Sequence, residues 1–349
     1  MARLIEGALL ELGRFDGTLA SMLNPDILLS PLRMNEAVLS SKIEGTQMTL
    51  TQALEYEAGT STDREKTPDG REIINYRSAL LNAEQGLYDS DRVINLTLIR
   101  MLHKNLMNNV RGGDKTPGQF RTEQNWIGKK GEPMEKARFI PPAPIIMHDY
   151  LENWTNFVND DQPSPLVQLA LIHAQFEIIH PFLDGNGRLG RMIIPLFMYQ
   201  KNILKRPVFY ISEYIDKNDR EYRDHLLAIT EAGDWMGWVL FFLRAVWEQA
   251  KINNNKASTI LKLYEEMKEE FRKATHSQYT QPALDAFFRY PVLTSTKFME
   301  ITELKNRITA NNILRNLAKN SLIELKRPGS GSKPATYGLR RLITEVEYI

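Results

Sequence analysis

Apolar residues recur at helical spacing in two neighbouring stretches, from Leu166 to Ile179 and from Leu189 to Tyr199. Before the first stretch, Ser164 and Pro165 are typical of a helix N-cap followed by proline at the first helical position. The residues between the stretches are polar and rich in glycine, which is typical of a turn. The pattern therefore predicts two buried helices joined by a tight turn that carries many polar side chains.

The same spacing predicts helices along most of the chain. The expected helical ranges are 2–87, interrupted by a polar loop at 59–70, and 96–107, 149–158, 219–232, 234–249 and 257–274. Two short extended runs, 118–128 and 137–142, surround a Gly/Pro turn and predict a β-hairpin. We therefore expect a mainly α fold with one short hairpin before the two apolar helices.

Residues 281–349 have a different pattern. A short helix is predicted over 295–304, and a second one begins at a Thr309 cap and ends near Leu317. Two extended runs follow, 322–327 and 335–339, joined by a flexible turn. Helix, helix, hairpin is the order of a winged helix-turn-helix domain, and this segment resembles that family of domains.

Composition limits the possible classes of protein. The 349 residues include no cysteine, which excludes disulfides and thiolate chemistry. The net charge of +1 argues against a chain built wholly around nucleic acid. The first six residues lack the pattern of a signal peptide, and the apolar stretch from Met192 stops at Gln200, too early to span a membrane. We expect a soluble cytoplasmic protein with no membrane partner.

Two arginines occupy an unusual place in the predicted turn. Arg188 and Arg191 fall at the start of the second helix, where the helix dipole is positive and acidic residues are normally favoured. Their spacing of three puts both on one face, so they repel each other unless an anion lies between them. Free backbone N–H groups would line the same place, from Gly185, Asn186 and Gly187. The arrangement predicts a site for a phosphate-rich anion.

Two further side chains add chemistry to this turn. Asp184 offers a hard oxygen ligand that suits Mg²⁺ bridging to phosphate oxygens. His180 lies four residues earlier and can accept a proton near neutral pH. The segment 185–190 also satisfies the glycine pattern of dinucleotide-binding folds, but a predicted helix precedes it where that fold needs a strand. The turn therefore predicts a polyphosphate held beside a metal and a base.

The twelve residues from His180 to Arg191 resemble the Fic family motif H-x-F-x-[DE]-G-N-G-R-x-x-R, and every specified position matches. The resemblance implies a protein adenylyltransferase (AMPylase), which transfers AMP from MgATP to a Ser, Thr or Tyr hydroxyl of a target protein, or of itself, and releases pyrophosphate. It also implies a helical core in which the hairpin is a flap that binds the target backbone. Some members move other phosphate-containing groups or remove AMP, so a deAMPylase using the same residues is a second possibility.

The resemblance also implies a role for each motif residue. His180 would deprotonate the target hydroxyl, and Asp184 would bind Mg²⁺. Asn186 and the amides of the turn would hold the α-phosphate of ATP, while Arg188 and Arg191 would grip the β- and γ-phosphates. Related proteins often form dimers, so a homodimer is expected. The target protein itself is not indicated by the sequence.

An upstream segment fits a second motif of part of this family. Ser40 and Glu44 match [ST]-x-x-x-E-[GN], which marks an inhibitory helix N-terminal to the core. The resemblance implies that Glu44 pairs with Arg191 and blocks productive placement of the γ-phosphate. A bidentate Arg–carboxylate pair in a partly dry cleft is strong enough for this role. A solvated helical glutamate is the alternative interpretation.

The expected domains are an N-terminal helical region with the inhibitory helix at 1–90, a Fic catalytic core at 91–250, a linker helix at 251–280 and the winged-helix domain at 281–349. This last domain has eleven Lys/Arg against six Asp/Glu, which leaves a DNA-binding regulator as an alternative function, with the core as a sensing or dimerising unit. The residues expected to face the major groove are Asn311, Asn312, Arg315 and Lys319, and those expected on phosphates are Lys326, Arg327 and Lys333. Protein contacts or dimerisation through the same domain remain the other possibility.

Overall fold

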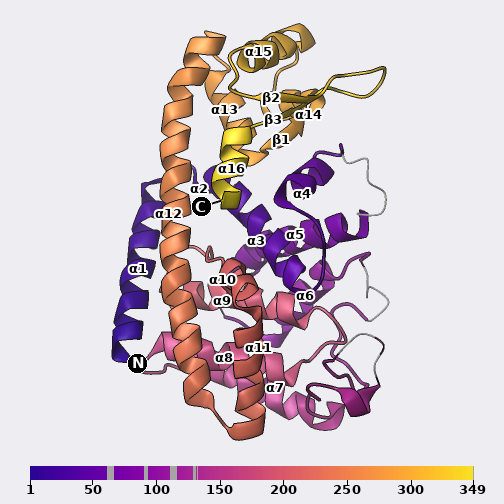
Figure 1. Cartoon of the computed structure of the whole chain (residues 1–349), viewed down its shortest axis with the longest axis vertical. Coiled ribbons are helices and arrows are strands. Elements are labelled where there is room, and N and C mark those ends of the chain that lie inside the picture. The colour runs from indigo at the N-terminus through magenta and orange to yellow at the C-terminus, as the bar shows by residue number, and fades with distance from the viewer. Residues whose placement is uncertain (61–66, 90–92, 111–115, 129–130, 132, 349) are drawn as a thin grey trace. The chain divides into compact units, whose positions relative to one another are not determined.

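The computed structural model describes the chain apart from residues 61–66, 90–92, 111–115, 129–130, 132 and 349 (Figure 1). The chain forms two compact units. The first consists of Met1–Asp16, Leu39–Thr46 and Arg71–Lys251, and the second of Gly17–Val38, Gln47–Gly70 and Ile252–Ile349. Helices dominate both units, and the strands of the described residues all belong to the second.

Four helices contribute residues to both units. They are α1 (Ala2–Ser21), α3 (Ser30–Ile43), α5 (Thr67–Asp89) and α12 (Trp235–Thr275). The other helical elements of the first unit are α6 (Leu96–Leu106), the 3₁₀ turn η1 (Met134–Lys136), α7 (Pro144–Asn159), α8 (Pro165–Ile179), α9 (Asn186–Gln200), α10 (Ser212–Lys217) and α11 (Asp219–Ala232).

Helices α8 and α9 form the centre of the first unit. Helix α8 packs between α7 and α9, and α6 covers another side of α9 (Figure 1). Every residue of α9 from Arg188 to Tyr199 is buried, including the two arginines. The indole N–H groups of Trp154 and Trp238 donate to carbonyls of α8, at 2.9 and 2.7 Å. The two buried helices predicted from the apolar spacing are thus confirmed.

The second unit contains a small antiparallel sheet in the order β1-β3-β2. Its elements are α2 (Pro25–Leu28), α4 (Leu50–Glu57), α13 (Thr280–Arg289), β1 (Val292–Thr294), α14 (Ser295–Ile301), α15 (Arg307–Lys319), β2 (Glu324–Arg327), β3 (Thr336–Gly338) and α16 (Arg340–Tyr348). Leu293 and Leu325 both lie opposite Tyr337 of the central strand. The predicted helix, helix and hairpin are present, while α13, β1 and α16 were not predicted.

The N-terminal cap of α15 differs from the prediction. Asn306 caps the helix, since its side chain accepts hydrogen bonds from the N–H groups of Ile308 and Thr309. Thr309 is therefore the third residue of the helix and not its cap. On β2, Lys326 pairs with Glu55 at 3.2 Å and Arg327 donates to the Thr60 carbonyl. These two cations, expected on DNA phosphates, already have partners within their own unit.

Among the described residues of 118–142, the predicted hairpin is reduced to one bridge, between Ile127 and Phe139. The first extended run binds elsewhere: the Arg121 N–H donates to the Pro181 carbonyl and Asn125 Nδ2 donates to the Phe182 carbonyl, both at 2.9 Å. Apart from the bridge at Ile127, the first run therefore binds the turn after α8. Residues 129, 130 and 132 of the expected turn lie outside the described residues.

Two helix boundaries also differ from the prediction. The ranges 234–249 and 257–274 are parts of the single helix α12, which continues through three consecutive asparagines. Asparagine is a weak helix former, but Asn253 is buried and Asn254 accepts a 2.7 Å hydrogen bond from Thr18. Residues 67–70 of the predicted loop belong to α5, and residues 61–66 lie outside the described part.

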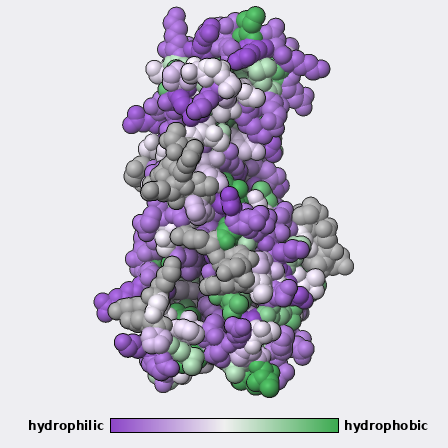
Figure 2. Space-filling view, turned by 90° about the vertical axis from the view of Figure 1, so that its right-hand side faces the viewer, coloured by the Kyte–Doolittle hydropathy of each residue, from purple (hydrophilic) through white to green (hydrophobic). Residues whose placement is uncertain are grey.

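One face of the molecule is mainly hydrophilic, with hydrophobic residues in separate small patches (Figure 2). Among the helices that the structure describes, none combines the length and the apolar character needed to cross a bilayer.

Candidate active site

The turn between α8 and α9 is built from two residues in the left-handed region. His180 ends α8 with φ +48°, and Gly185 precedes α9 with φ +79°. A β-carbon at Gly185 would lie 2.9 Å from the Met107 sulfur, so only glycine fits. The Asn186 side chain spans the turn, accepting from the Phe182 N–H at 2.9 Å and donating to the Phe182 carbonyl at 2.8 Å. The turn is therefore fixed by its own sequence.

This turn opens onto a cleft of about 910 Å³ in the first unit. The predicted site residues that line it are His180, Asp184, Gly187, Arg188, Arg191 and Glu44. The other three lie beside the cleft. Ser40 is buried against Arg191, the Asn186 side chain is used within the turn, and the Gly185 N–H donates to Asp184 Oδ1 at 2.6 Å. The structure thus gathers residues that are up to 151 positions apart in the sequence.

Arg191 is bound by the segment at the end of α3. Its Nε donates to Ser40 Oγ and its Nη2 donates to both the Ser40 carbonyl and Glu44 Oε1, each at 2.8 Å. Glu44 thus makes one hydrogen bond to the guanidinium, through the same Nη2 that donates to the Ser40 carbonyl, and the expected bidentate pairing is not formed. Burial would raise the pKa of Glu44, but the charge and hydrogen bond of Arg191 outweigh it and lower the pKa below its usual value. Glu44 is therefore ionised at neutral pH.

Several contacts fix Glu44 in the cleft. It is the first residue after α3, in a turn that follows the helix. Arg223 of α11 donates to the Ile43 carbonyl at 3.3 Å, and Lys42 pairs with Asp216 at 2.7 Å. Gly187 makes room for the carboxylate, because a β-carbon there would overlap Glu44 Oε1. The first turn of α9 and the end of α3 are therefore complementary in shape as well as charge.

Arg188 has a carboxylate partner of its own. Its Nη1 pairs with Glu72 of α5 at 3.2 Å, and its Nη2 lies 3.4 Å from Asp184 Oδ1. The side chains of Arg188 and Glu72 are only 4% and 6% exposed. We expected one anion between the two arginines, whereas each arginine has a separate carboxylate. Sequence analysis missed Glu72, which lies 116 residues from Arg188 and in no motif.

His180 is arranged to act as a base. Its Nδ1 lies 3.3 Å from the Glu177 carbonyl, which can only accept a hydrogen bond, so Nδ1 carries the proton. This leaves the lone pair of Nε2 available. Burial lowers the pKa of His180 to about 4, although the nearby carboxylates of Glu44 and Asp184 act in the opposite direction. The imidazole is therefore neutral, and able to accept a proton, throughout the neutral range.

The wall behind Arg191 contains a second set of titratable side chains. Burial raises the pKa of Glu177 to about 7 and raises that of Tyr222 well above its usual value. The Tyr222 hydroxyl lies 2.8 Å from His173 Nε2, and burial lowers the pKa of His173 to about 3. His173 is thus a buried core residue paired with Tyr222. Glu177 was missed, because nothing in its sequence neighbourhood separates it from a surface glutamate.

Asp184 is the one motif residue suited to a metal. Its carboxylate is 39% exposed at the cleft, and its backbone carbonyl accepts a 2.9 Å hydrogen bond from His103 Nε2. Among the described residues, no group of three or more His, Cys, Asp or Glu could hold a metal ion. A single accessible carboxylate still fits Mg²⁺, which usually takes one or two carboxylates and completes its shell with phosphate oxygens and water.

His103 supports Asp184 from α6. Its Nδ1 accepts the Gly118 N–H at 2.8 Å, so Nε2 carries the proton that is donated to Asp184. Its ring stacks on Phe182 with 3.7 Å between ring centroids. Burial lowers the pKa of His103 to about 4, so the ring is neutral. Both hydrogen-bonding partners of His103 are backbone groups, so no side-chain pattern in the sequence indicates its place in the site.

The flap residues form the outer wall of the cleft. Trp126, Ile127, Gly128, Arg138 and Phe139 line it, and the Ile127 N–H donates to the Phe139 carbonyl at 2.8 Å. Arg138 forms an ion pair with Asp224 of α11. The described flap residues therefore line the same cleft as His180, and they form one bridge in place of the expected two-stranded hairpin.

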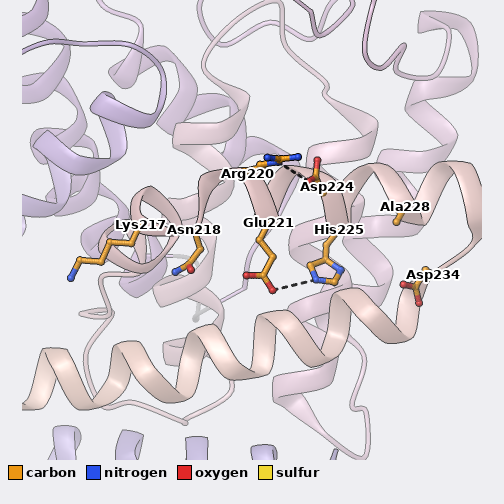
Figure 3. A pocket seen from close by; sticks show the side chains of 8 residues that line it. All are labelled: Lys217, Asn218, Arg220, Glu221, Asp224, His225, Ala228 and Asp234. Carbon is orange, nitrogen blue, oxygen red and sulfur yellow. Dashed lines mark ion pairs between the residues drawn. The ribbon is translucent and has the colours of Figure 1, made fainter.

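A second hollow, of about 620 Å³, lies along α11 (Figure 3). Its charged side chains pair with each other along the helix, His225 with Glu221 and Arg220 with Asp224, each at 3.7 Å. These i,i+4 pairs are partly or fully exposed and are typical of a solvated helix face. No motif residue lines this hollow, so the candidate active site is the cleft at the turn.

Comparison with protein families gives two matches. Residues 2–85 match the model described as Fic/DOC family N-terminal, and residues 93–198 match the model described as Fic/DOC family. The second match contains His180 and both motif arginines, and the first contains Ser40, Glu44 and Glu72.

Curated relatives and a solved structure are also similar. Protein adenylyltransferase Fic of Drosophila mojavensis is 30% identical over 207 residues, which are 57% of this chain and 37% of that protein. A probable protein adenylyltransferase of Aquifex aeolicus is 25% identical over 178 residues, or 50% of this chain and 51% of that protein. A Fic family protein from Desulfovibrio desulfuricans G20 shares the fold, with a TM-score of 0.58, 20% identity and coverage of 96% of this chain and 95% of that chain. The chain thus matches about a third to a half of the length of these curated relatives.

Proposed function

The chain belongs to the Fic/DOC family, whose two models together cover more than half of it, and we propose that it is an autoinhibited protein adenylyltransferase. The observation that carries this proposal is the environment of Arg191. A phosphate-binding arginine of the motif lies in the cleft beside a neutral histidine, and the carboxylate of Glu44 occupies its Nη2. The names of the curated relatives support the same activity.

The proposed reaction is an in-line displacement at the α-phosphorus of ATP. The oxygen of a target Ser, Thr or Tyr hydroxyl forms the new bond to phosphorus, and its proton passes to Nε2 of His180. The bond between the α-phosphorus and the bridging oxygen breaks, and pyrophosphate leaves. A base positioned in this way accelerates such a step by about 10²–10⁴-fold.

The rest of the site would position the triphosphate and balance its charge. Arg188 and Arg191 would bind the β- and γ-phosphates, and the N–H groups of Asn186 and Gly187 at the start of α9 would face the α-phosphate. When bound at Asp184, Mg²⁺ would neutralise charge on the phosphates. The Asn186 side chain would act by keeping the turn in shape, because both of its polar ends already bind Phe182.

The latch (Ser40, Glu44 and Arg191) accounts for the inhibition. Glu44 and a γ-phosphate would compete for the same guanidinium, so productive binding of ATP requires Glu44 to leave. A hydrogen bond to a charged group contributes about 1.5–3 kcal/mol. Removal of Glu44 should therefore raise activity roughly 10–100-fold, at about 1.4 kcal/mol for each factor of ten.

The test uses Glu44→Gly protein with MgATP radiolabelled in either the α- or the γ-phosphate. Adenylyl transfer incorporates the α-label into protein and leaves the γ-label in pyrophosphate. Incorporation of the γ-label would indicate phosphoryl transfer and contradict the proposal. Incubation of purified AMP-modified protein with wild type then tests AMP removal, which would appear as loss of the α-label.

We propose DNA binding by a winged helix at 281–349 as a second function, and the surface of α15 favours it. The helix contains no acidic residue, and residues 305–333 hold seven Lys/Arg against one Asp/Glu. Its apolar residues Ala310, Ile313, Leu314 and Leu317 are buried. The exposed side chains are Arg307, Ile308, Asn312, Arg315, Asn316 and Lys319. Cations and amides on one helix face suit phosphates and base edges in a major groove.

Titration of the full chain against a labelled DNA duplex over a range of salt tests this second function. Arg315→Glu and Lys319→Glu together should weaken binding at low salt by about tenfold or more and lower the slope of log K against log salt concentration. Arg341→Glu is the matched control, since Arg341 pairs with Glu266 and Glu270 on another face of the same unit. Equal binding by wild type and the α15 variant would contradict the proposal.

A further inference from the structure

Arg121 lies in the flap segment and is buried against the end of α8, with 1% of its surface exposed. Its guanidinium donates only to backbone carbonyls. Nε donates to His180 at 3.0 Å, Nη1 to Glu123 at 3.3 Å, and Nη2 to Pro142 and, at 3.4 Å, to Ile179. Within the described part of the chain, no carboxylate lies within ion-pair distance of Arg121. The buried arginines that line the cleft, Arg188 and Arg191, by contrast each bind a carboxylate.

The end of α8 explains how such a cation can be buried. The last carbonyls of a helix have no partner within the helix and carry the negative end of its dipole. Two of the acceptors of Arg121, Ile179 and His180, are the last residue of α8 and its C-cap. A buried charge is tolerated only when it is well paired and hydrogen-bonded, and the helix end supplies both conditions. Arg121 is therefore the cationic cap of α8.

The same contacts fix the backbone that carries the candidate base. His180 has φ +48°, a conformation that is unfavourable for residues other than glycine and persists only where surrounding contacts impose it. Arg121 binds the His180 carbonyl through Nε, and its backbone N–H binds the Pro181 carbonyl at 2.9 Å. One residue thus holds two successive peptide groups after the His180 Cα. The imidazole can only point into the cleft while this backbone is kept.

We infer that Arg121 is a positioning residue for His180, which holds the left-handed backbone of the base and places a fixed positive charge behind its imidazole. This inference rests on the proposed function, in which His180 accepts the proton of the target hydroxyl. Arg121 acts through His180 and does not itself contact the substrate.

The electrostatics of His180 agree with this role. Burial is the largest cause of its lowered pKa, and the charge of Arg121 acts in the same direction. The groups acting in the opposite direction are the Glu177 carbonyl of α8, the Glu44 carboxylate after α3 and the Asp184 carboxylate of the turn. Removal of the Arg121 charge should therefore raise the pKa of His180, so that the base becomes protonated at higher pH.

The test compares Arg121→Gln and Arg121→Lys in the Glu44→Gly protein. Arg121→Gln should lower the maximal rate of AMP incorporation by about 10–100-fold, as expected for a displaced catalytic group. The MgATP concentration for half-maximal rate should change less than about twofold, because no phosphate contact is lost. The acid limb of the pH profile should move to higher pH. Arg121→Lys should also have a lower maximal rate, because it loses the planar guanidinium that binds the carbonyls. The acid limb of its pH profile should stay where it is in the parent, because lysine keeps the positive charge.

Arg33→Gln is the control for loss of a buried guanidinium elsewhere. Arg33 is 6% exposed, pairs with Asp26 and belongs to the second unit. The Arg33→Gln substitution should leave both the maximal rate and the acid limb of the pH profile unchanged. If Arg121→Gln fails to fold, Arg121→Lys is the deciding variant, and a rate equal to that of the Glu44→Gly parent would overturn the inference. A parental rate and acid limb in Arg121→Gln, or a loss confined to MgATP affinity, would overturn it as well.

A measurement independent of activity separates this inference from the proposed function. The imidazole of His180 is titrated by NMR in wild type and in both Arg121 variants, with its signal assigned by its loss in His180→Ala. The pKa should rise by about half a unit or more in Arg121→Gln and stay unchanged in Arg121→Lys. An unchanged pKa in Arg121→Gln would overturn the electrostatic role, even if no adenylyl transfer were found.

Discussion

The two helix ends that meet at the turn hold their arginines in different ways. At the start of α9, Arg188 and Arg191 bind the carboxylates of Glu72 and Glu44, at 3.2 and 2.8 Å. At the end of α8, Arg121 binds four backbone carbonyls. The dipoles explain the difference, because a cation is favoured at a helix C-terminus and needs an added anion at an N-terminus.

The difference separates exchangeable contacts from permanent ones. A carboxylate can be replaced at a guanidinium by a phosphate, which has the same charge sign and similar geometry. A backbone carbonyl cannot leave without unfolding the turn. In the proposed function, the start of α9 would therefore exchange anions, and the end of α8 would hold the base. Four predictions test this contrast, from the largest expected effect to the smallest.

His180, at the end of α8, should be the base that accepts the hydroxyl proton. In the Glu44→Gly protein, His180→Ala should lower the initial rate of AMP incorporation by about 10²–10⁴-fold, because no other group takes the hydroxyl proton. Rates are measured with ATP labelled in the α-phosphate. The control His225→Ala removes a histidine on α11 that lines the second hollow and should keep the parent rate. Comparable rates in His180→Ala and its parent would place the base elsewhere.

Removing the Glu44 carboxylate from the start of α9 should raise the rate of AMP incorporation. Glu44→Gly should raise the rate over wild type by roughly 10–100-fold. Glu44→Gln should have a smaller effect, because the amide oxygen can still accept from Arg191 but carries no charge. The comparison is made at one MgATP concentration below saturation. A rate in Glu44→Gly no higher than in wild type would show that Glu44 does not compete with the triphosphate.

The pair of Arg188 and Glu72 should be coupled in stability. Removing one partner leaves a buried charge, so Arg188→Gln and Glu72→Gln should each destabilise the protein, and the double variant by less than their sum. The expected coupling energy is about 1.5–3 kcal/mol. It is measured by urea unfolding of the four proteins. A coupling below about 0.5 kcal/mol would mean that the two side chains act independently.

Protonation of His180 should have little effect on the rate of AMP incorporation near neutral pH. Since its pKa is lowered to about 4, the imidazole stays neutral down to about two units below its usual titration range. From pH 8 to pH 6, protonation of His180 should reduce the rate by less than about twofold, and the loss should appear as the pH falls toward 4. The profile is recorded with circular dichroism at each pH to confirm folding. A single-proton limb centred near pH 6.5 would contradict the lowered pKa.

The sequence predicted those parts of the site that are local. The spacing of Leu166 to Ile179, the motif from His180 to Arg191 and the predicted helix 219–232 all depend on neighbouring residues, and the structure has these elements where they were expected. The placement of Glu44 against Arg191 was predicted from a resemblance, and it is present as a contact.

The parts that were missed depend on distant contacts. Glu72, His103 and Arg121 bind groups that are 116, 81 and 59 positions away, and each looks like an ordinary helix or loop residue in the sequence. The flap was read as a hairpin because its alternation resembles a strand, whereas its first run binds the turn. The ranges 234–249 and 257–274 were predicted as two helices, whereas α12 is continuous, with Asn253 buried and Asn254 hydrogen-bonded between them.

The most direct measurement is the intact mass of wild type, Glu44→Gly and Glu44→Gly/His180→Ala after incubation with MgATP. A gain of one AMP or more in Glu44→Gly, little or none in wild type and none in the double variant would support the transfer reaction, the latch and the role of His180 together. No gain in Glu44→Gly, with MgATP binding established by a separate titration, would contradict the account.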